Sequence, residues 1–184
     1  MSCIVGLKDG NTLYMGADSA GVLGLDITVR ADEKVFRRGE MLFGFTTSFR
    51  MGQILRYCLQ IPERRPGQDD YEFLCTHFID AVVACLSEKG FAKTKDGEKS
   101  GGIFLLGYRG NIYKIESDFQ VGKSAVRYEA VGCGDKYAKG ALHFMTGPAA
   151  SDLRLPAEVV VREALAAAAK HSAGVCEPFI VERL

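Results

Sequence analysis

The apolar residues of this chain occur in two kinds of segment, which alternate along the sequence. Short apolar runs bounded by turn signals predict β-strands at residues 3–7, 12–17, 26–30, 34–37, 41–45, 103–108, 112–116, 128–131 and 179–184. Asp9-Gly10, Gly39 and Arg109-Gly110-Asn111 supply the turns of three hairpins. The first 45 residues are therefore expected to form strands and turns only.

Longer segments repeat their apolar residues at helical spacing. This pattern predicts helices at about residues 51–59, 71–88, 135–145 and 156–170. Pro62 ends the first helix, and Pro156 suits the first turn of the last. Residues 62–70 and 92–100 are polar and are expected to be loops.

The order of these elements is strands, two helices, strands, two helices and a final strand. Each sheet and each amphipathic helix must bury one apolar face against another layer. We therefore expect an α+β fold in which two antiparallel sheets pack together and a helix pair covers each outer face. This four-layer αββα sandwich would form a single domain over residues 1–184.

Composition restricts the classes of function. The 23 Lys and Arg residues balance the 23 Asp and Glu residues, so no basic surplus favours nucleic acid or an anionic membrane as a partner. We recognise no leader and no long apolar run, which predicts a cytoplasmic protein. No zinc-ligand spacing is found, and neither a metal nor a cofactor is expected. The cysteines are expected to be reduced and buried: Cys3, Cys58, Cys75, Cys85, Cys133 and Cys176.

Candidate chemistry lies at the start of the chain. After Met1 the sequence reads SCIVGLKDG, and LYMGADS follows at residues 13–19. Asp18 stands sixteen positions after Ser2, and Lys34 stands sixteen positions after Asp18. These segments and this spacing resemble the start of proteasome β-subunits and of the peptidase subunit of the bacterial heat-shock-locus protease. The chain is thus similar to the proteasome-type N-terminal nucleophile (Ntn) hydrolases.

The resemblance continues along nearly the whole chain. MLFGFTTS at residues 41–48 matches the strand that leads to the family's oxyanion-hole position and places Ser48 there. VGCG at residues 131–134 resembles the segment that opens the third helix, with Cys133 where a supporting serine is common. Ser172 and the ending at residues 179–184 resemble the close of the bacterial peptidase.

The resemblance implies a mechanism built on Ser2. A serine hydroxyl needs a base, and an N-terminal residue supplies one through its own amine, whose ordinary pKa is about 7.7–8.0. That amine is free only after Met1 is removed. Lys34 would lie beside the hydroxyl as a cation, Asp18 would hold Lys34 charged, and the Ser48 N–H would stabilise the oxyanion. Kin of this type form rings that cleave unfolded polypeptide, often with an ATPase partner.

Three hypotheses follow. The first is a ring-forming endopeptidase with Ser2 as its nucleophile. The second is a silent, proteasome-like structural subunit, favoured by Cys133, by Ala169 where the proteasome branch has a carboxylate, and by retention of Met1. The third is a small-molecule amidase in which Cys3 becomes the first residue, although its spacing to Asp18 fits the family less well. A Ser-His-Asp site is not expected, because the histidines, His77, His143 and His171, are scattered over predicted helices.

Overall fold

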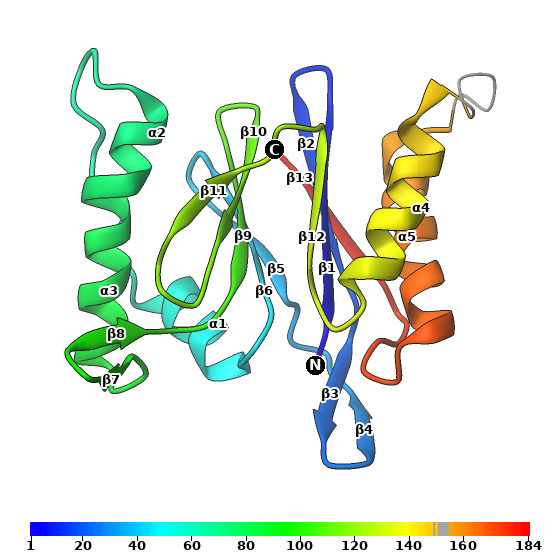
Figure 1. Ribbon diagram of the computed structural model, residues 1–184, viewed down its shortest axis with the longest axis horizontal. Helices are drawn as coiled ribbons and strands as arrows, with labels where there is room; N and C mark the ends of the chain where they lie inside the picture. Colours follow the sequence, from blue (N-terminus) through cyan, green and yellow to red (C-terminus); the bar gives the residue numbers. More distant parts are fainter. Residues whose placement is uncertain (149, 151–154) are drawn as a thin grey trace.

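The structure, a computed structural model, describes residues 1–148, 150 and 155–184. Two antiparallel sheets lie face to face, and helices cover both outer faces (Figure 1). This arrangement is the predicted four-layer αββα sandwich. Among the described residues, no helix is long and apolar enough to cross a membrane.

The first sheet has the order β12-β1-β2-β13 and carries the N-terminus on one of its two central strands. Its strands are β1 (Cys3–Asp9), β2 (Thr12–Ala17), β12 (Tyr128–Gly132) and β13 (Ile180–Arg183). Helices α4 (Asp135–Thr146) and α5 (Ala157–His171) cover its outer face (Figure 1). Because both faces of β1 are covered, its residues Cys3 to Leu7 are all buried, which explains a continuous apolar run rather than an alternating one.

The second sheet has the order β11-β10-β9-β6-β5. Its strands are β5 (Val35–Arg38), β6 (Met41–Phe45), β9 (Phe104–Tyr108), β10 (Asn111–Ile115) and β11 (Val121–Lys123). Its outer face packs against α1 (Phe49–Tyr57) and a longer helical segment made of α2 (Asp70–Phe73), a π-helical turn (Leu74–Phe78) and α3 (Ile79–Glu88).

Alternate residues of strand β6 point to opposite faces of the second sheet and so belong to different hydrophobic cores. Met41, Phe43 and Phe45 of β6 enter the core beneath α1 and α3, whereas Leu42 enters the core between the sheets. Gly44 also faces the other sheet, where an added Cβ would lie 2.5 Å from the Ile4 side chain. The two sheets therefore approach each other closely at this point, next to the N-terminus.

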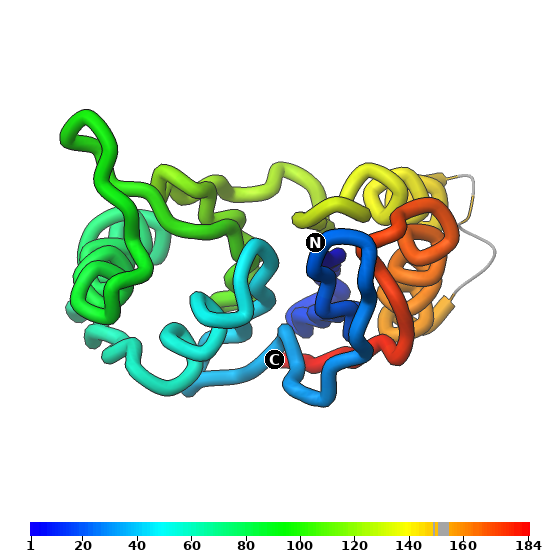
Figure 2. The backbone as a smooth tube through the Cα atoms, turned by 90° about the horizontal axis from the view of Figure 1, so that it is seen from below, coloured from blue at the N-terminus to red at the C-terminus, as the bar shows by residue number. Residues whose placement is uncertain are grey.

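Several predicted boundaries were wrong. Residues 92–100, expected to be a loop, contain the exposed hairpin β7 (Lys93–Lys95) and β8 (Glu98–Ser100). Strands β3 (Ala20–Leu23) and β11 were not predicted. The structure pairs β3 with β4 (Asp26–Val29) in another hairpin. This hairpin projects from the end of the sandwich that holds the N-terminus (Figures 1 and 2).

Candidate active site

Ser2 lies directly before β1, where the two sheets come together. The residue is 4% exposed, and its hydroxyl donates a hydrogen bond to the Met1 carbonyl. Gly132 of the neighbouring strand has a φ of 106°, and a Cβ there would lie 2.2 Å from the Ser2 carbonyl oxygen. The close backbone approach and the positive φ together require glycine at this position.

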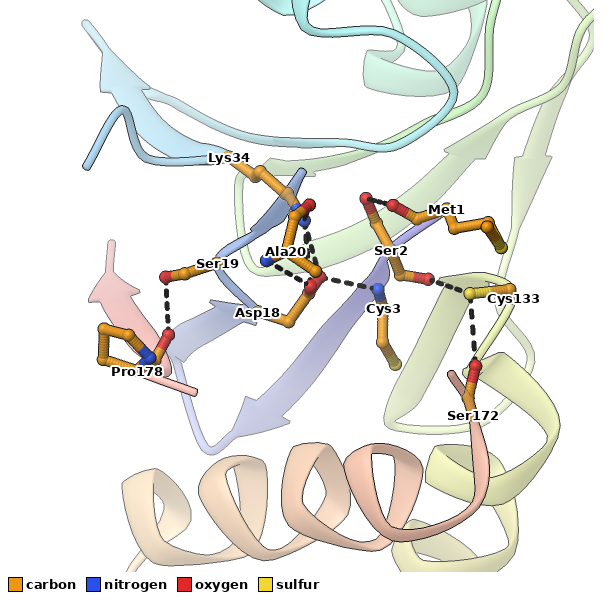
Figure 3. Close-up of polar contacts among 10 residues, drawn as sticks. All are labelled: Met1, Ser2, Cys3, Asp18, Ser19, Ala20, Lys34, Cys133, Ser172 and Pro178. Carbon is orange, nitrogen blue, oxygen red and sulfur yellow. Dashed lines mark hydrogen bonds and ion pairs between the residues drawn. The ribbon is translucent and has the colours of Figure 1, made fainter. Parts of the chain in front are cut away.

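Asp18 is tied to the residue that follows Ser2. Its Oδ1 accepts a hydrogen bond from the Cys3 N–H at 2.8 Å, and its Oδ2 accepts one from the Ala20 N–H at 2.8 Å. These two backbone donors fix the position of the carboxylate. Asp18, immediately after β2, is thereby held beside the first strand and its N-terminal residue (Figure 3).

Lys34 completes a buried ion pair with Asp18. Its Nζ donates to both carboxylate oxygens at 2.9 Å and to the Ala20 carbonyl at 2.7 Å, so three acceptors surround the ammonium. The side chains of Lys34 and Asp18 are 1% and 0% exposed. Burial lowers the pKa of Lys34, and the negative charge of Asp18 opposes that shift. The result is a fixed cation in a water-poor environment, where its charge acts more strongly than at the surface.

The loop after β6 lies next to Ser2. Ile103 fixes this loop, because its carbonyl accepts from the Thr46 N–H at 3.1 Å and its N–H donates to Thr47 Oγ1 at 3.1 Å. The loop and Ser2 line one cavity of about 70 Å³, which includes Ser48. The Ser48 N–H, predicted for the oxyanion hole, donates at 2.8 Å to the Thr46 carbonyl. A role in stabilising an oxyanion requires this bond to be exchanged for one to substrate.

Ser48 also begins α1. Its hydroxyl accepts a hydrogen bond from the Arg50 N–H at 3.1 Å, which is the role of an N-cap residue. Sequence reasoning missed this second function, although a serine directly before a helical apolar pattern is the usual sign of a helix N-terminus.

Cys133 and Ser172 lie on the opposite side of Ser2 from Lys34 (Figure 3). The Cys133 thiol donates to the Ser2 carbonyl at 3.4 Å, and the Ser172 hydroxyl donates to Cys133 Sγ at 3.2 Å. The structure therefore brings all six candidate residues around the N-terminus: Ser2, Asp18, Lys34, Ser48, Cys133 and Ser172. A thiol is a weaker hydrogen-bond partner than a hydroxyl, so Cys133 holds the Ser2 backbone only loosely.

Comparison with known proteins identifies the architecture. No family model matches the sequence, and no curated protein matches it significantly. Two solved structures of BPH from Thiobacillus denitrificans, one in complex with epoxomicin, match with a TM-score of 0.80 and 21% identity, over 99% of this chain and 97% of that chain. Eukaryotic HslV from Trypanosoma brucei matches with a TM-score of 0.70 and 18% identity, over 99% and 98%. The (Gly-1) mutant of Anbu from Hyphomicrobium sp. strain MC1 matches with a TM-score of 0.66 and 17% identity, over 100% and 82%.

The chain has the fold of the proteasome-type Ntn hydrolases. The resemblance seen in the sequence is confirmed at the level of the fold. Identities of 17–21% do not carry the activity of these proteins over to this chain. The chemical roles of the individual residues therefore depend on the geometry described above.

The prediction that the six cysteines are buried was wrong for most of them. All six are free thiols, but only Cys3 is fully buried, and Cys75 and Cys133 are exposed. In the helical segment that contains Cys75, the residues that face the core are Leu74 and Phe78. Burial raises the pKa of the Cys3 thiol well above its ordinary value, and the neighbouring negative charge of Asp18 adds to the effect.

Some residues of the site could not be found from the sequence. The Ala20 carbonyl completes the coordination of the Lys34 ammonium, and main-chain groups carry no residue-type signal. The aromatic walls of the cavity, Phe45 and Phe49, read as ordinary core residues in a strand and a helix. Only the packing of β6 and α1 against the N-terminus shows that they face Ser2.

Proposed function

We propose that this chain is an Ntn peptidase in which Ser2, freed by removal of Met1, is the nucleophile. The observation that supports it most directly is the buried Lys34–Asp18 pair, whose carboxylate is hydrogen-bonded to the N–H of the residue after Ser2. Buried charges are costly, and a site that retains them needs a reason such as catalysis. The proteasome-type fold of the chain agrees with this interpretation.

The proposed reaction has two steps. The free Ser2 amine accepts the hydroxyl proton, and Ser2 Oγ attacks the carbonyl carbon of the scissile peptide bond. The Lys34 ammonium and the loop N–H at Ser48 stabilise the developing negative charge. The leaving amine takes the proton and departs, and water then hydrolyses the ester bond to Ser2. Asp18 contributes by holding Lys34 in place and charged.

We further propose that the chain works as a homo-oligomeric ring acting on unfolded polypeptide. The β3–β4 hairpin supports assembly, because Leu23 and Leu25 near its turn are 84% and 103% exposed. Apolar side chains grouped in this way are typical of a contact with another protein surface. Folded substrates would need unfolding first, for which the family resemblance implies an ATPase partner.

Mass spectrometry tests the nucleophile. We expect the protein isolated from its own cells to lack one methionine, and incubation with a peptide epoxyketone that has alanine next to its reactive group to add one inhibitor to the peptide that begins at Ser2. Ser2→Ala should lose this labelling. A native chain that keeps Met1 and takes up no inhibitor would refute the peptidase proposal.

That outcome would favour a silent structural subunit, the second candidate. The observation in its favour is that the Ser48 N–H is already donated to Thr46, which leaves the oxyanion position without that donor. Native mass measurement would then show assembly without peptide turnover. The amidase hypothesis fits less well, because Cys3 is 0% exposed and burial raises the pKa of its thiol.

The rate of peptide hydrolysis should show a bell-shaped dependence on pH. It should rise as the Ser2 amine loses its proton, near its ordinary pKa of about 7.7–8.0. It should fall again when Lys34 loses its proton, and because burial lowers the pKa of Lys34, this fall should begin below the ordinary lysine value of 10.5. Measurement of kcat/KM from about pH 6 to about pH 11 tests both limbs. A rate that stays constant up to pH 10.5 would contradict the role of Lys34.

A further inference from the structure

The cavity next to Ser2 is small and has aromatic walls. Its volume is about 70 Å³, and Val22, Phe45 and Phe49 form its apolar sides. This volume corresponds to roughly two water molecules at about 30 Å³ each. Met1 forms another wall, so removal of Met1 opens the cavity toward Ser2 while Phe45 and Phe49 remain in place.

Phe45 cannot move away from the cavity toward α1. A Cβ added at Gly52 would lie 2.2 Å from Cε1 of Phe45, so the ring already packs directly on the helix backbone. The rings of Phe45 and Phe49 meet edge to face, with their centroids 5.7 Å apart. Such pairs have a preferred geometry, which limits how far either ring can shift.

Phe49 is held from outside by an arginine. The Arg30 guanidinium carbon lies 4.1 Å from the centroid of the Phe49 ring. Asp32 fixes that guanidinium through two hydrogen bonds of 2.6 Å, to Nε and Nη2. A planar guanidinium that donates through two of its three nitrogens presents a flat, oriented face to the ring. Arg30 and Asp32 belong to the segment between β4 and β5, so their contact with Phe49 connects the base of the β3–β4 hairpin to the cavity.

We infer that this cavity receives the side chain on the acyl side of the scissile bond and accepts only small ones, with Phe49 setting the limit and Arg30 positioning Phe49. The inference rests on the proposed function. When Ser2 Oγ attacks a peptide carbonyl, the side chain next to that carbonyl is the first to meet the cavity. Removal of Met1 enlarges the cavity on one side only, and the rings of Phe45 and Phe49 still bound it. Alanine or serine enters without moving either ring, whereas leucine and phenylalanine would have to displace one.

Peptide coumarin amides that differ only in the residue before the scissile bond test this inference, with alanine, leucine or phenylalanine at that position. For the mature wild-type protein we expect kcat/KM to be at least about tenfold higher for alanine than for phenylalanine. Phe49→Ala should lower this ratio at least about tenfold, chiefly by improving the phenylalanine substrate. Arg30→Gln should lower it about threefold, because the ring is released but not removed.

Arg162→Gln is the matched control, since Arg162 also pairs with a carboxylate, Glu158, but lies on α5. It should leave the ratio unchanged. Labelling by a peptide epoxyketone with alanine next to its reactive group counts the active sites of each variant, and Phe49→Leu replaces Phe49→Ala if the latter does not fold. A wild-type preference for leucine or phenylalanine, or a ratio that Phe49 and Arg30 variants leave unchanged, overturns the inference alone. Absence of both cleavage and labelling overturns it together with the proposed function.

Discussion

Lys34→Met should destabilise the protein by about 3–5 kcal/mol and reduce peptide hydrolysis by at least about a hundredfold. Methionine has a similar length but leaves the buried Asp18 carboxylate without its counter-ion. The carboxylate would keep the N–H groups of Cys3 and Ala20 as partners, which satisfy its hydrogen bonds but not its charge. Urea unfolding and kcat/KM, measured where circular dichroism shows a folded variant, separate the two effects.

Lys95→Met is the control for this substitution. Lys95 lies on the exposed hairpin strand β7, so its loss should change stability by no more than about 0.5 kcal/mol and leave hydrolysis as it is. If Lys34→Met unfolded at the same urea concentration as the wild type, Lys34 and Asp18 would not form a buried charge pair in solution. The catalytic proposal would then lose its main support.

The ion pair was predicted from the family resemblance, and its constant spacing has a structural cause, because the chain returns to its starting point between the two residues. The β3–β4 hairpin leaves the body after Asp18 and comes back where the Arg30 N–H donates to the Ser19 carbonyl at 2.8 Å. Lys34 therefore arrives beside Asp18 whatever the hairpin contains. The hairpin itself was only half predicted, since Gly21 and Gly24 interrupt the apolar pattern of β3 and its turn.

Other features could not be predicted because the local pattern does not carry them. The hairpin of β7 and β8 has charged and polar residues that are exposed along both strands, so it lacks the alternation that marks a half-buried strand. The long helical segment buries Leu74, Phe78, Val82 and Leu86, which are spaced by four residues. A period of four exceeds the 3.6 of an α-helix, and a wider π-helical turn at Leu74–Phe78 keeps such a stripe on the core.

The walls of the cavity beside Ser2 likewise could not be predicted from the local sequence pattern. Ser2, Asp18 and Lys34 are recognisable because each has a residue type that the chemistry needs at a set distance along the chain. Phe49 and Arg30 have no such constraint, and their contact at 4.1 Å exists only because α1 begins next to the segment after β4. Candidates for the proposed reaction can thus be named from the family resemblance, whereas residues that shape the space around them require the packed structure.

Ser2→Ala should abolish peptide hydrolysis, by at least about a thousandfold, and leave stability almost unchanged. The hydroxyl is the attacking atom in the proposed reaction, yet its hydrogen bond in the structure is to the carbonyl of the adjacent Met1, which is absent from the mature chain. Ser2→Thr keeps the hydroxyl and should retain kcat/KM within about tenfold of the wild type. Urea unfolding of the three proteins should agree within about 1 kcal/mol. Because Lys34→Met lowers both activity and stability while Ser2→Ala lowers activity alone, the pair of substitutions distinguishes the nucleophile from the charge that supports it. Hydrolysis that survives Ser2→Ala would assign the reaction to another group.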